Sequence, residues 1–156
     1  MDVQWDQDAS TRRATLCRIL RSLRTRAGLR TQDIAEAMGM GYRTYQRFEA
    51  GEQGVDLETI RRFAQIVEAD PWGIILGVEF GSVDFALNTA ANKAASWLLV
   101  ALRRFDRRAG KDIASLDPRT LSFIFSRGFD QISVKAQEVE AELEQWMLDG
   151  DLGGET

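Results

Sequence analysis

The sequence contains no histidine, one cysteine and two prolines in 156 residues. Histidine is the usual general base of enzymes at neutral pH and the commonest metal ligand in proteins. The single cysteine, Cys17, excludes an internal disulfide framework and a cysteine-cluster metal site. Neither a phosphate-binding Gly-x-x-x-x-Gly-Lys loop nor a Gly-x-Ser-x-Gly nucleophile motif is present. These absences predict a protein that is not an enzyme and that needs no cofactor or metal.

Long apolar runs are also missing from the chain. The longest, residues 97–102, is far shorter than the roughly 20 residues that cross a bilayer. Residues 1–10 are acidic and lack the basic-then-apolar order of a signal peptide. We therefore expect a cytoplasmic protein without membrane contact, and a composition of 44% hydrophobic residues favours a packed core over disorder.

The net charge is −4, yet the charges are unevenly distributed. Between residues 12 and 47, nine arginines stand against only two acidic residues. A local basic surface attracts phosphates even when the chain as a whole is acidic. This pattern favours a nucleic-acid partner, with an Arg-rich solvated helix face as the alternative.

Apolar residues recur at helical spacing along most of the chain, and no alternating stretch of strand length occurs. The pattern predicts an all-α protein with five helices in its N-terminal part and about three in its C-terminal part. The five expected N-terminal helices span about 15–27, 31–38, 42–50, 56–67 and 71–76.

Residues 31–50 fit two helices that cross closely around a tight turn. Ala35 is small enough to lie where the helices touch, and Gly39 tolerates the positive φ of the turn. Tyr45 is the large side chain that would fix the second helix in place. The outward positions of that helix then all carry hydrogen-bonding side chains: Tyr42, Arg43, Gln46 and Arg47. This arrangement is typical of a helix-turn-helix, whose second helix enters the major groove of DNA.

The same region resembles the lambda-repressor/Cro-like (XRE-type) family of helix-turn-helix transcriptional regulators. Four segments match in order: LRTRAGL at 23–29, IAEAMGM at 34–40, RTYQRFEAG at 43–51 and DLETI at 56–60. The resemblance covers about 16–76, which is under half of the chain. It implies that double-stranded DNA is the partner, that Tyr42, Arg43 and Arg47 read bases with Gln46 beside them, and that Arg24 pairs with Glu49.

The sequence departs from the family pattern at two places. Thr31, followed by Gln32, stands where the family usually has a glutamine that grips the DNA backbone, although Thr31 could cap the second helix. The loop at 52–54 lacks the basic residues expected there. We therefore expect phosphate contacts from the following set: Arg12, Arg13, Arg18, Arg30, Thr31 and Gln32. Cys17 is interpreted as a small helix side chain rather than a redox switch.

The second half of the chain is expected to form helices over about 83–109, 118–128 and 130–149. The first of these is apolar on nearly every side around Trp97 and Leu98. The last has a seam of apolar residues at heptad spacing: Ile132, Ala136, Val139, Leu143 and Trp146. Glutamates flank the seam at positions 138, 140, 142 and 144. These features favour self-association through Trp97, Leu98, Val139, Leu143 and Trp146, with packing inside one monomer as the alternative.

The predicted organisation has five parts: a flexible arm (1–14), a helix-turn-helix DNA-binding domain (15–76), a linker (77–82), a helical dimerisation or regulatory domain (83–149) and a disordered tail (150–156). The predicted function is a homodimeric transcriptional repressor of bacterial or phage origin that binds specific DNA sequences. One alternative is an activator or adaptor whose C-terminal helices bind RNA polymerase or another regulator. Another is a helix-turn-helix-fold module that binds proteins and not DNA.

Overall fold

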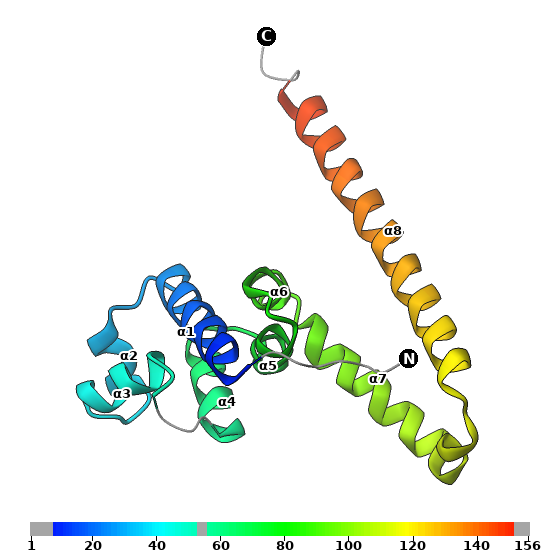
Figure 1. The fold of residues 1–156 in the computed structure, drawn as a ribbon. Coiled ribbons are helices and arrows are strands. Elements are labelled where there is room, and N and C mark those ends of the chain that lie inside the picture. Colours follow the sequence, from blue (N-terminus) through cyan, green and yellow to red (C-terminus); the bar gives the residue numbers. More distant parts are fainter. Residues whose placement is uncertain (1–7, 53–55, 152–156) are drawn as a thin grey trace. The chain divides into compact units, whose positions relative to one another are not determined.

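The computed structural model describes residues 8–52 and 56–151, with side chains described as far as Trp146, and every element in these ranges is a helix (Figure 1). The prediction of an all-α protein is confirmed. The helices are α1 (Ala9–Arg26), α2 (Thr31–Ala37), α3 (Tyr42–Glu49), α4 (Leu57–Ile66), α5 (Pro71–Phe80), α6 (Val83–Thr89), α7 (Ala94–Ala109), the 3-10 helix η1 (Gly110–Ser115) and α8 (Pro118–Asp151). The chain divides into two compact units, residues 1–105 and residues 106–156.

The core of the first unit forms around α1, which packs against α3, α5 and α6. Ile19 and Leu20 of α1 are completely buried, as are Ile34 of α2 and Tyr45 of α3. Phe48 lies between the rings of Tyr45 and Phe63, with ring centroids 5.8 and 5.9 Å apart. Aromatic and branched side chains from four helices thus hold α2 and α3 on one side of α1.

The first helix begins earlier than the sequence predicts. Asp8 is its N-cap, because the Asp8 carboxylate accepts a hydrogen bond of 2.6 Å from the backbone N–H of Thr11. Residues 9–14, which were expected to belong to a flexible arm, are therefore helical. Residues 1–7 of that arm, and residues 152–156 of the expected tail, lie outside the described residues.

The expected linker over 77–82 is not a linker in this structure. Helix α5 continues to Phe80 and ends at Gly81, which has φ +68°, and Ser82 then caps α6. Gly77 lies against α6, because a Cβ at this position would be 3.1 Å from that of Ala86. The glycine that suggested a boundary is therefore a close helix–helix contact, and Ala86 of α6 is fully buried in the first unit.

The single helix expected over 83–109 is divided into α6 and α7. Lys93 precedes α7 with φ +56°, a backbone conformation that cannot continue an α-helix. The completely buried carboxylate of Asp70 fixes the start of α7, since it accepts hydrogen bonds from the backbone N–H (2.9 Å) and the hydroxyl (2.6 Å) of Ser96. Helical periodicity missed this break because the alanines on either side of it, at 90, 91, 94 and 95, are strong helix formers.

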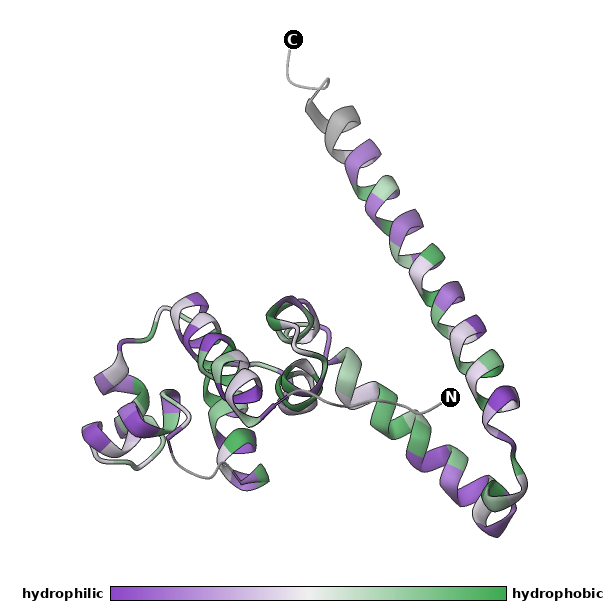
Figure 2. Ribbon diagram, viewed as in Figure 1, coloured by the Kyte–Doolittle hydropathy of each residue, from purple (hydrophilic) through white to green (hydrophobic). Residues whose placement is uncertain are grey.

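The two C-terminal helices expected over 118–128 and 130–149 are one continuous helix, α8. Gly128 was expected to end the first of them. A glycine inside a helix costs only about 1 kcal/mol relative to alanine, and apolar residues continue at helical spacing on both sides of it. Along α8, hydrophobic and hydrophilic residues alternate turn by turn (Figure 2). Among the described residues, no helix has the length and hydrophobicity that a membrane span requires.

Candidate nucleic-acid interface

Helix α3 presents one buried and one exposed side. Tyr45, Phe48 and Glu49 are buried against the core. The opposite side consists of exposed side chains: Tyr42, Arg43, Gln46 and Arg47. Because residues four apart lie on the same face of a helix, Arg43 and Arg47 project side by side from the surface. The four residues expected to read bases are thus all exposed, on a helix whose other side is buried in the core.

The turn between α2 and α3 is closed by backbone hydrogen bonds. Gly39 has φ +65°, which a residue with a Cβ rarely adopts. The N–H of Met40 donates to the carbonyl of Ala35 at 2.9 Å, and the N–H of Gly39 donates to that of Glu36 at 2.9 Å. Arg62 of α4 adds a side-chain bond of 3.3 Å to the carbonyl of Met38. The angle between α2 and α3 is therefore fixed by the backbone as well as by packing.

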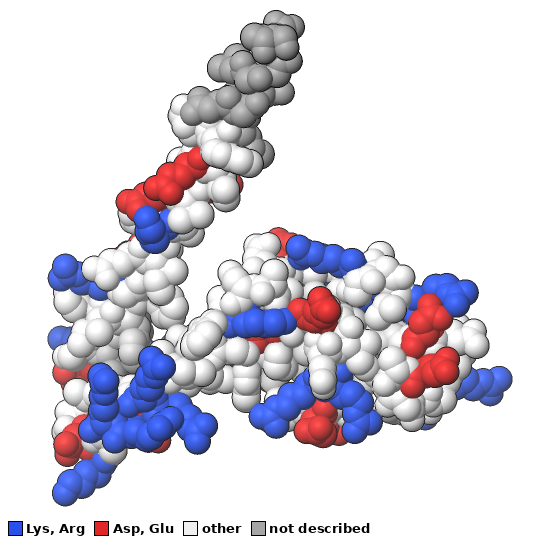
Figure 3. All heavy atoms as spheres, turned by 180° about the vertical axis from the view of Figure 1, so that it is seen from behind, with Lys and Arg blue, Asp and Glu red and all other residues white. Residues whose placement is uncertain are grey.

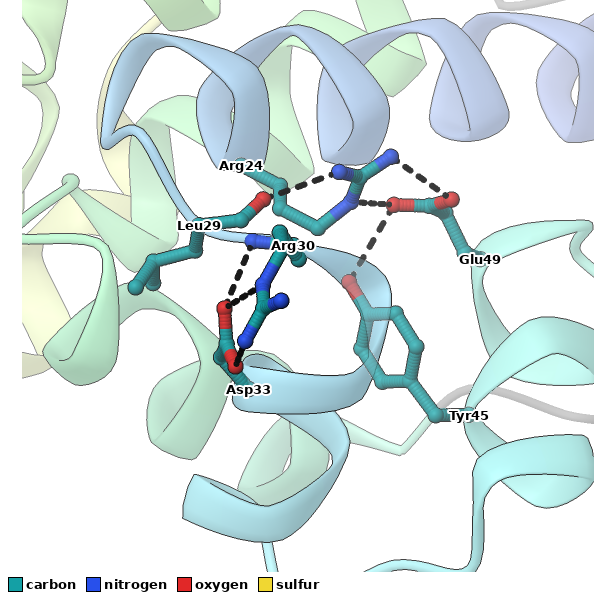
Figure 4. A network of polar contacts seen from close by, with 6 residues as sticks. All are labelled: Arg24, Leu29, Arg30, Asp33, Tyr45 and Glu49. Atoms are coloured by element: carbon teal, nitrogen blue, oxygen red, sulfur yellow. Dashed lines mark hydrogen bonds and ion pairs between the residues drawn. The ribbon is translucent and has the colours of Figure 1, made fainter.

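A polar network joins α1 to α3 (Figure 4). The Nε of Arg24 donates to Oε1 of Glu49 at 2.6 Å, and its Nη2 donates to Oε2 at 3.4 Å. The Nη1 of Arg24 donates to the carbonyl of Leu29 at 3.0 Å, while the hydroxyl of Tyr45 donates to Oε1 of Glu49 at 3.2 Å. The structure thus brings Arg24 and Glu49, the pair that the resemblance implies, together with Tyr45, which was expected to fix the second helix in place.

Burial makes this network stiff. The Arg24 and Glu49 side chains are only 14% and 9% exposed, so water competes weakly for their hydrogen bonds. The hydrogen bond to Glu49 raises the pKa of Arg24 above its usual value, and burial raises the pKa of Tyr45. Arg24 and Tyr45 therefore both keep their protons throughout the physiological pH range.

The start of α2 lies beside Tyr42 of α3. Arg30, Thr31, Gln32 and Tyr42 line a shallow hollow on the surface. Arg30, and not Thr31, is the N-cap of α2, and the Asp33 carboxylate accepts bonds from the backbone N–H and the guanidinium of Arg30 (Figure 4). The hydrogen bonds from the Arg30 guanidinium hold the pKa of Asp33 below its usual value. The expectation that Thr31 caps this helix is wrong, because Thr31 is the first residue of the helix and Arg30, with extended backbone (φ −76°, ψ 155°), precedes it.

The remaining three expected phosphate contacts do not form one surface. Arg13 lies against Gly51, at the turn that follows α3. Arg12 forms an ion pair of 3.7 Å with Glu79 of α5 instead. Arg18 is exposed on α1 and has no ion pair among the described residues. The structure therefore gathers Arg30, Thr31 and Gln32 beside α3, with Arg13 near the other end of that helix.

Two features of the site were not anticipated from the sequence. Arg47 lies 3.7 Å from the carboxylate of Glu52, in an exposed ion pair that DNA would have to displace. Cys17, with Arg13, contacts the Gly51 turn, and burial raises the pKa of the Cys17 thiol. A raised thiol pKa leaves little reactive thiolate at neutral pH.

On the face of the first unit that Figure 3 shows, basic and acidic side chains are interspersed.

Comparison with known proteins agrees with this geometry. Residues 16–71 match the family model described as a helix-turn-helix domain. Residues 16–71 therefore form a helix-turn-helix domain, as the resemblance to XRE-type regulators implies, and this is a class of domain found in DNA-binding regulators. No curated protein and no solved structure matches the chain.

Proposed function

We propose that the chain is a sequence-specific DNA-binding repressor that acts as a homodimer. The observation that carries the proposal is the exposed face of α3, where Arg43, Gln46 and Arg47 project from a helix whose opposite face is buried. A guanidinium can donate two hydrogen bonds to the O6 and N7 atoms of a guanine in the major groove. Each such contact discriminates between bases by about 1–3 kcal/mol.

The hollow beside α3 supplies contacts that position the helix. Arg30, Thr31, Gln32 and Tyr42 all carry donors and surround one surface depression at the start of α2. Such donors bind phosphate oxygens and set the register of a recognition helix without reading sequence. Arg13 provides a second contact near the end of α3. We assign Arg12 a secondary role because Glu79 already neutralises its charge.

Two observations support dimerisation: a single copy offers only a small surface to DNA, and its C-terminal helices expose large apolar side chains. One recognition helix covers about one half-site, and regulators of this class commonly bind two half-sites as dimers. Large apolar side chains are exposed on α7 and α8, including Trp97 (63%), Leu98 (40%), Val139 (43%), Leu143 (55%) and Trp146 (73%). Each of the two helices by itself exposes large apolar side chains, and exposed apolar patches commonly mark protein–protein contacts. We therefore assign these residues to self-association.

Repression requires the fewest further contacts, because a dimer on promoter DNA excludes polymerase by occupying its site. The same exposed surface of α7 and α8 supports a second candidate, an activator or adaptor whose C-terminal helices bind polymerase or another regulator. A reporter gene placed downstream of a bound site separates these two functions, because repression lowers its transcription and activation raises it.

Filter binding on random-sequence duplex DNA tests whether the domain binds DNA at all. The full chain should bind with an affinity that falls steeply as the salt concentration rises, because phosphate contacts release counterions. Arg30→Gln combined with Arg13→Gln should make this dependence shallower by about two in slope. The absence of binding at low salt would contradict the proposal and favour a protein-binding role for the helix-turn-helix fold.

A further inference from the structure

Helix α8 is not covered by the described residues of its own unit, 106–156. It spans 34 residues, Pro118–Asp151, and none of its described side chains is buried. Only Leu121 and Gly128 are even partly covered. A helix of this length draws most of its stability from packing of an apolar face rather than from its own hydrogen bonds. The exposed face of α8 therefore requires a partner from outside its own unit.

The continuity of α8 lengthens its heptad seam. Because Gly128 does not end the helix, the seam begins at Phe125 and its members follow one another at alternating spacings of four and three residues: Phe125, Phe129, Ile132, Ala136, Val139, Leu143 and Trp146. The large members are all strongly exposed, from 43% for Val139 to 73% for Trp146. This spacing keeps one narrow stripe facing a second helix, as in a two-stranded coiled coil.

We propose that this seam binds the seam of a second copy of the chain in antiparallel orientation, with Ala136 opposite Val139 of the second copy. The inference rests on the proposed dimer and specifies which surface forms it. In this register Ile132 lies opposite Leu143 of the second copy, and Phe129 lies opposite Trp146. The arrangement is two-fold symmetric, so each contact occurs twice.

The sizes of the seam residues favour this orientation. In a parallel pair, residues at the same position face each other, and Ala136 would meet a second Ala136 in the middle of the seam. Two methyl groups leave a void there, and voids in packed interiors are destabilising. The antiparallel register places the larger Val139 against each Ala136 and leaves no layer with two small side chains.

The charges along α8 favour the antiparallel orientation more strongly than the side-chain sizes do. Residues 136–146 carry four glutamates and no basic residue, and acidic side chains gather on the C-terminal part of this helix (Figure 3). A parallel pair would align these glutamates with those of the second copy. The antiparallel register places them beside residues 129–139 of the second copy, where Lys135 offsets one of the acidic residues Asp130 and Glu138. Like-charge repulsion along the pair is therefore smaller.

Lys135 has an acidic neighbour in either orientation, but a different one in each. Its ion pair with Glu138 is exposed, so Lys135 is free to bind elsewhere as well (side chains 66% and 55% exposed). In the antiparallel pair the flanking contact is Lys135 with Glu142 of the second copy. In a parallel pair it is Lys135 with Glu140 of the second copy. The two orientations are therefore distinguishable by substitution on the surface of the helix.

Cysteine crosslinking of the full chain tests the orientation directly. In a Cys17→Ser background, Ile132→Cys with Leu143→Cys should form a covalent dimer on mild oxidation. Each single substitution should leave the chain uncrosslinked, because like positions lie apart in the antiparallel register. A covalent dimer from Ile132→Cys alone would overturn the antiparallel arrangement and leave the proposed dimer intact.

Charge exchange tests the same register without changing the seam. Lys135→Glu should weaken dimerisation by roughly two- to thirtyfold, because two exposed ion pairs are lost. Adding Glu142→Lys should restore it, and adding Glu140→Lys should not. If adding Glu140→Lys restored dimerisation and adding Glu142→Lys did not, the pair would be parallel. A full chain that sediments as a monomer would overturn both this inference and the dimer, while filter binding would still report DNA affinity separately.

Discussion

Two arginines on α3 are central to the account at the scale of single residues. Arg43→Ala and Arg47→Ala should each lose about 1–3 kcal/mol of preference at one or two base pairs while the domain folds normally. The reason is that both side chains are exposed, on the side of α3 opposite the buried Tyr45 and Phe48. Binding measured on single-base variants of a bound site checks this. Equal weakening on every sequence would instead make them phosphate contacts.

Arg24 tests the junction between α1 and α3. Arg24→Ala should lower the free energy of unfolding by about 3 kcal/mol, because the buried carboxylate of Glu49 loses its ion pair and, among the described residues, keeps the Tyr45 hydroxyl as its side-chain partner. Arg26→Ala is the matched control on the same helix. Arg26 makes one exposed bond of 3.1 Å to the carbonyl of Leu87, so its loss should cost about 0.5 kcal/mol. Denaturant melts of both variants that showed equal losses would remove the pair from the account.

At the scale of elements, the N-terminal helices could be predicted from the sequence because their signals are local. Gly28, Gly39 and Gly51 have positive φ and end α1, α2 and α3 where the pattern places them. The order of the motifs around these glycines also predicted which side of α3 is exposed. The Asp70–Ser96 contact could not be predicted, since 26 residues separate the two and nothing in the local pattern links them.

The structural roles of Gly77 and Gly128 were ambiguous in the sequence, because they too depend on residues that are neighbours in space and not in the local pattern. A glycine can end a helix, allow two helices to approach, or occur within a helix at small cost, and only the neighbours in space decide. Gly77 allows α5 to approach α6, and Gly128 is simply part of α8. Their sequence contexts gave no indication of this difference, which is why the linker and the break in the last helix were predicted incorrectly.

Replacing these two glycines by alanine should therefore have opposite effects. Gly77→Ala should destabilise the first unit by about 1–3 kcal/mol, because its Cβ would lie 2.9 Å from the carbonyl oxygen of Ser82. Gly128→Ala should stabilise α8 by about 0.5–1 kcal/mol, since nothing lies within 4 Å of the added methyl group. Thermal melts of the two variants give the comparison. A neutral Gly77→Ala would contradict the close packing of α5 on α6.

At the scale of the whole molecule, the structural units predict how the chain tolerates truncation. A chain ending at Phe105 should stay folded, whereas one ending at Gly81 should lose about 3 kcal/mol or more because it lacks buried residues of α6 such as Ala86. By light scattering, the chain ending at Phe105 should also dimerise much more weakly than the full chain, because it keeps Trp97 and Leu98 of α7 but lacks the whole seam of α8. Its affinity for a two-half-site operator should fall by orders of magnitude. A truncated chain as dimeric as the full one would contradict this assignment.

The central claim is that α3 of a dimer reads specific DNA. Selection of bound duplexes from a random pool by the full chain tests it most directly. The account predicts an enriched sequence with two half-sites related by inverted symmetry, and it predicts that the most conserved guanines lose their conservation when the selection is repeated with Arg43→Ala or Arg47→Ala. A pool that shows no enrichment, or the same enrichment with both variants, would contradict it.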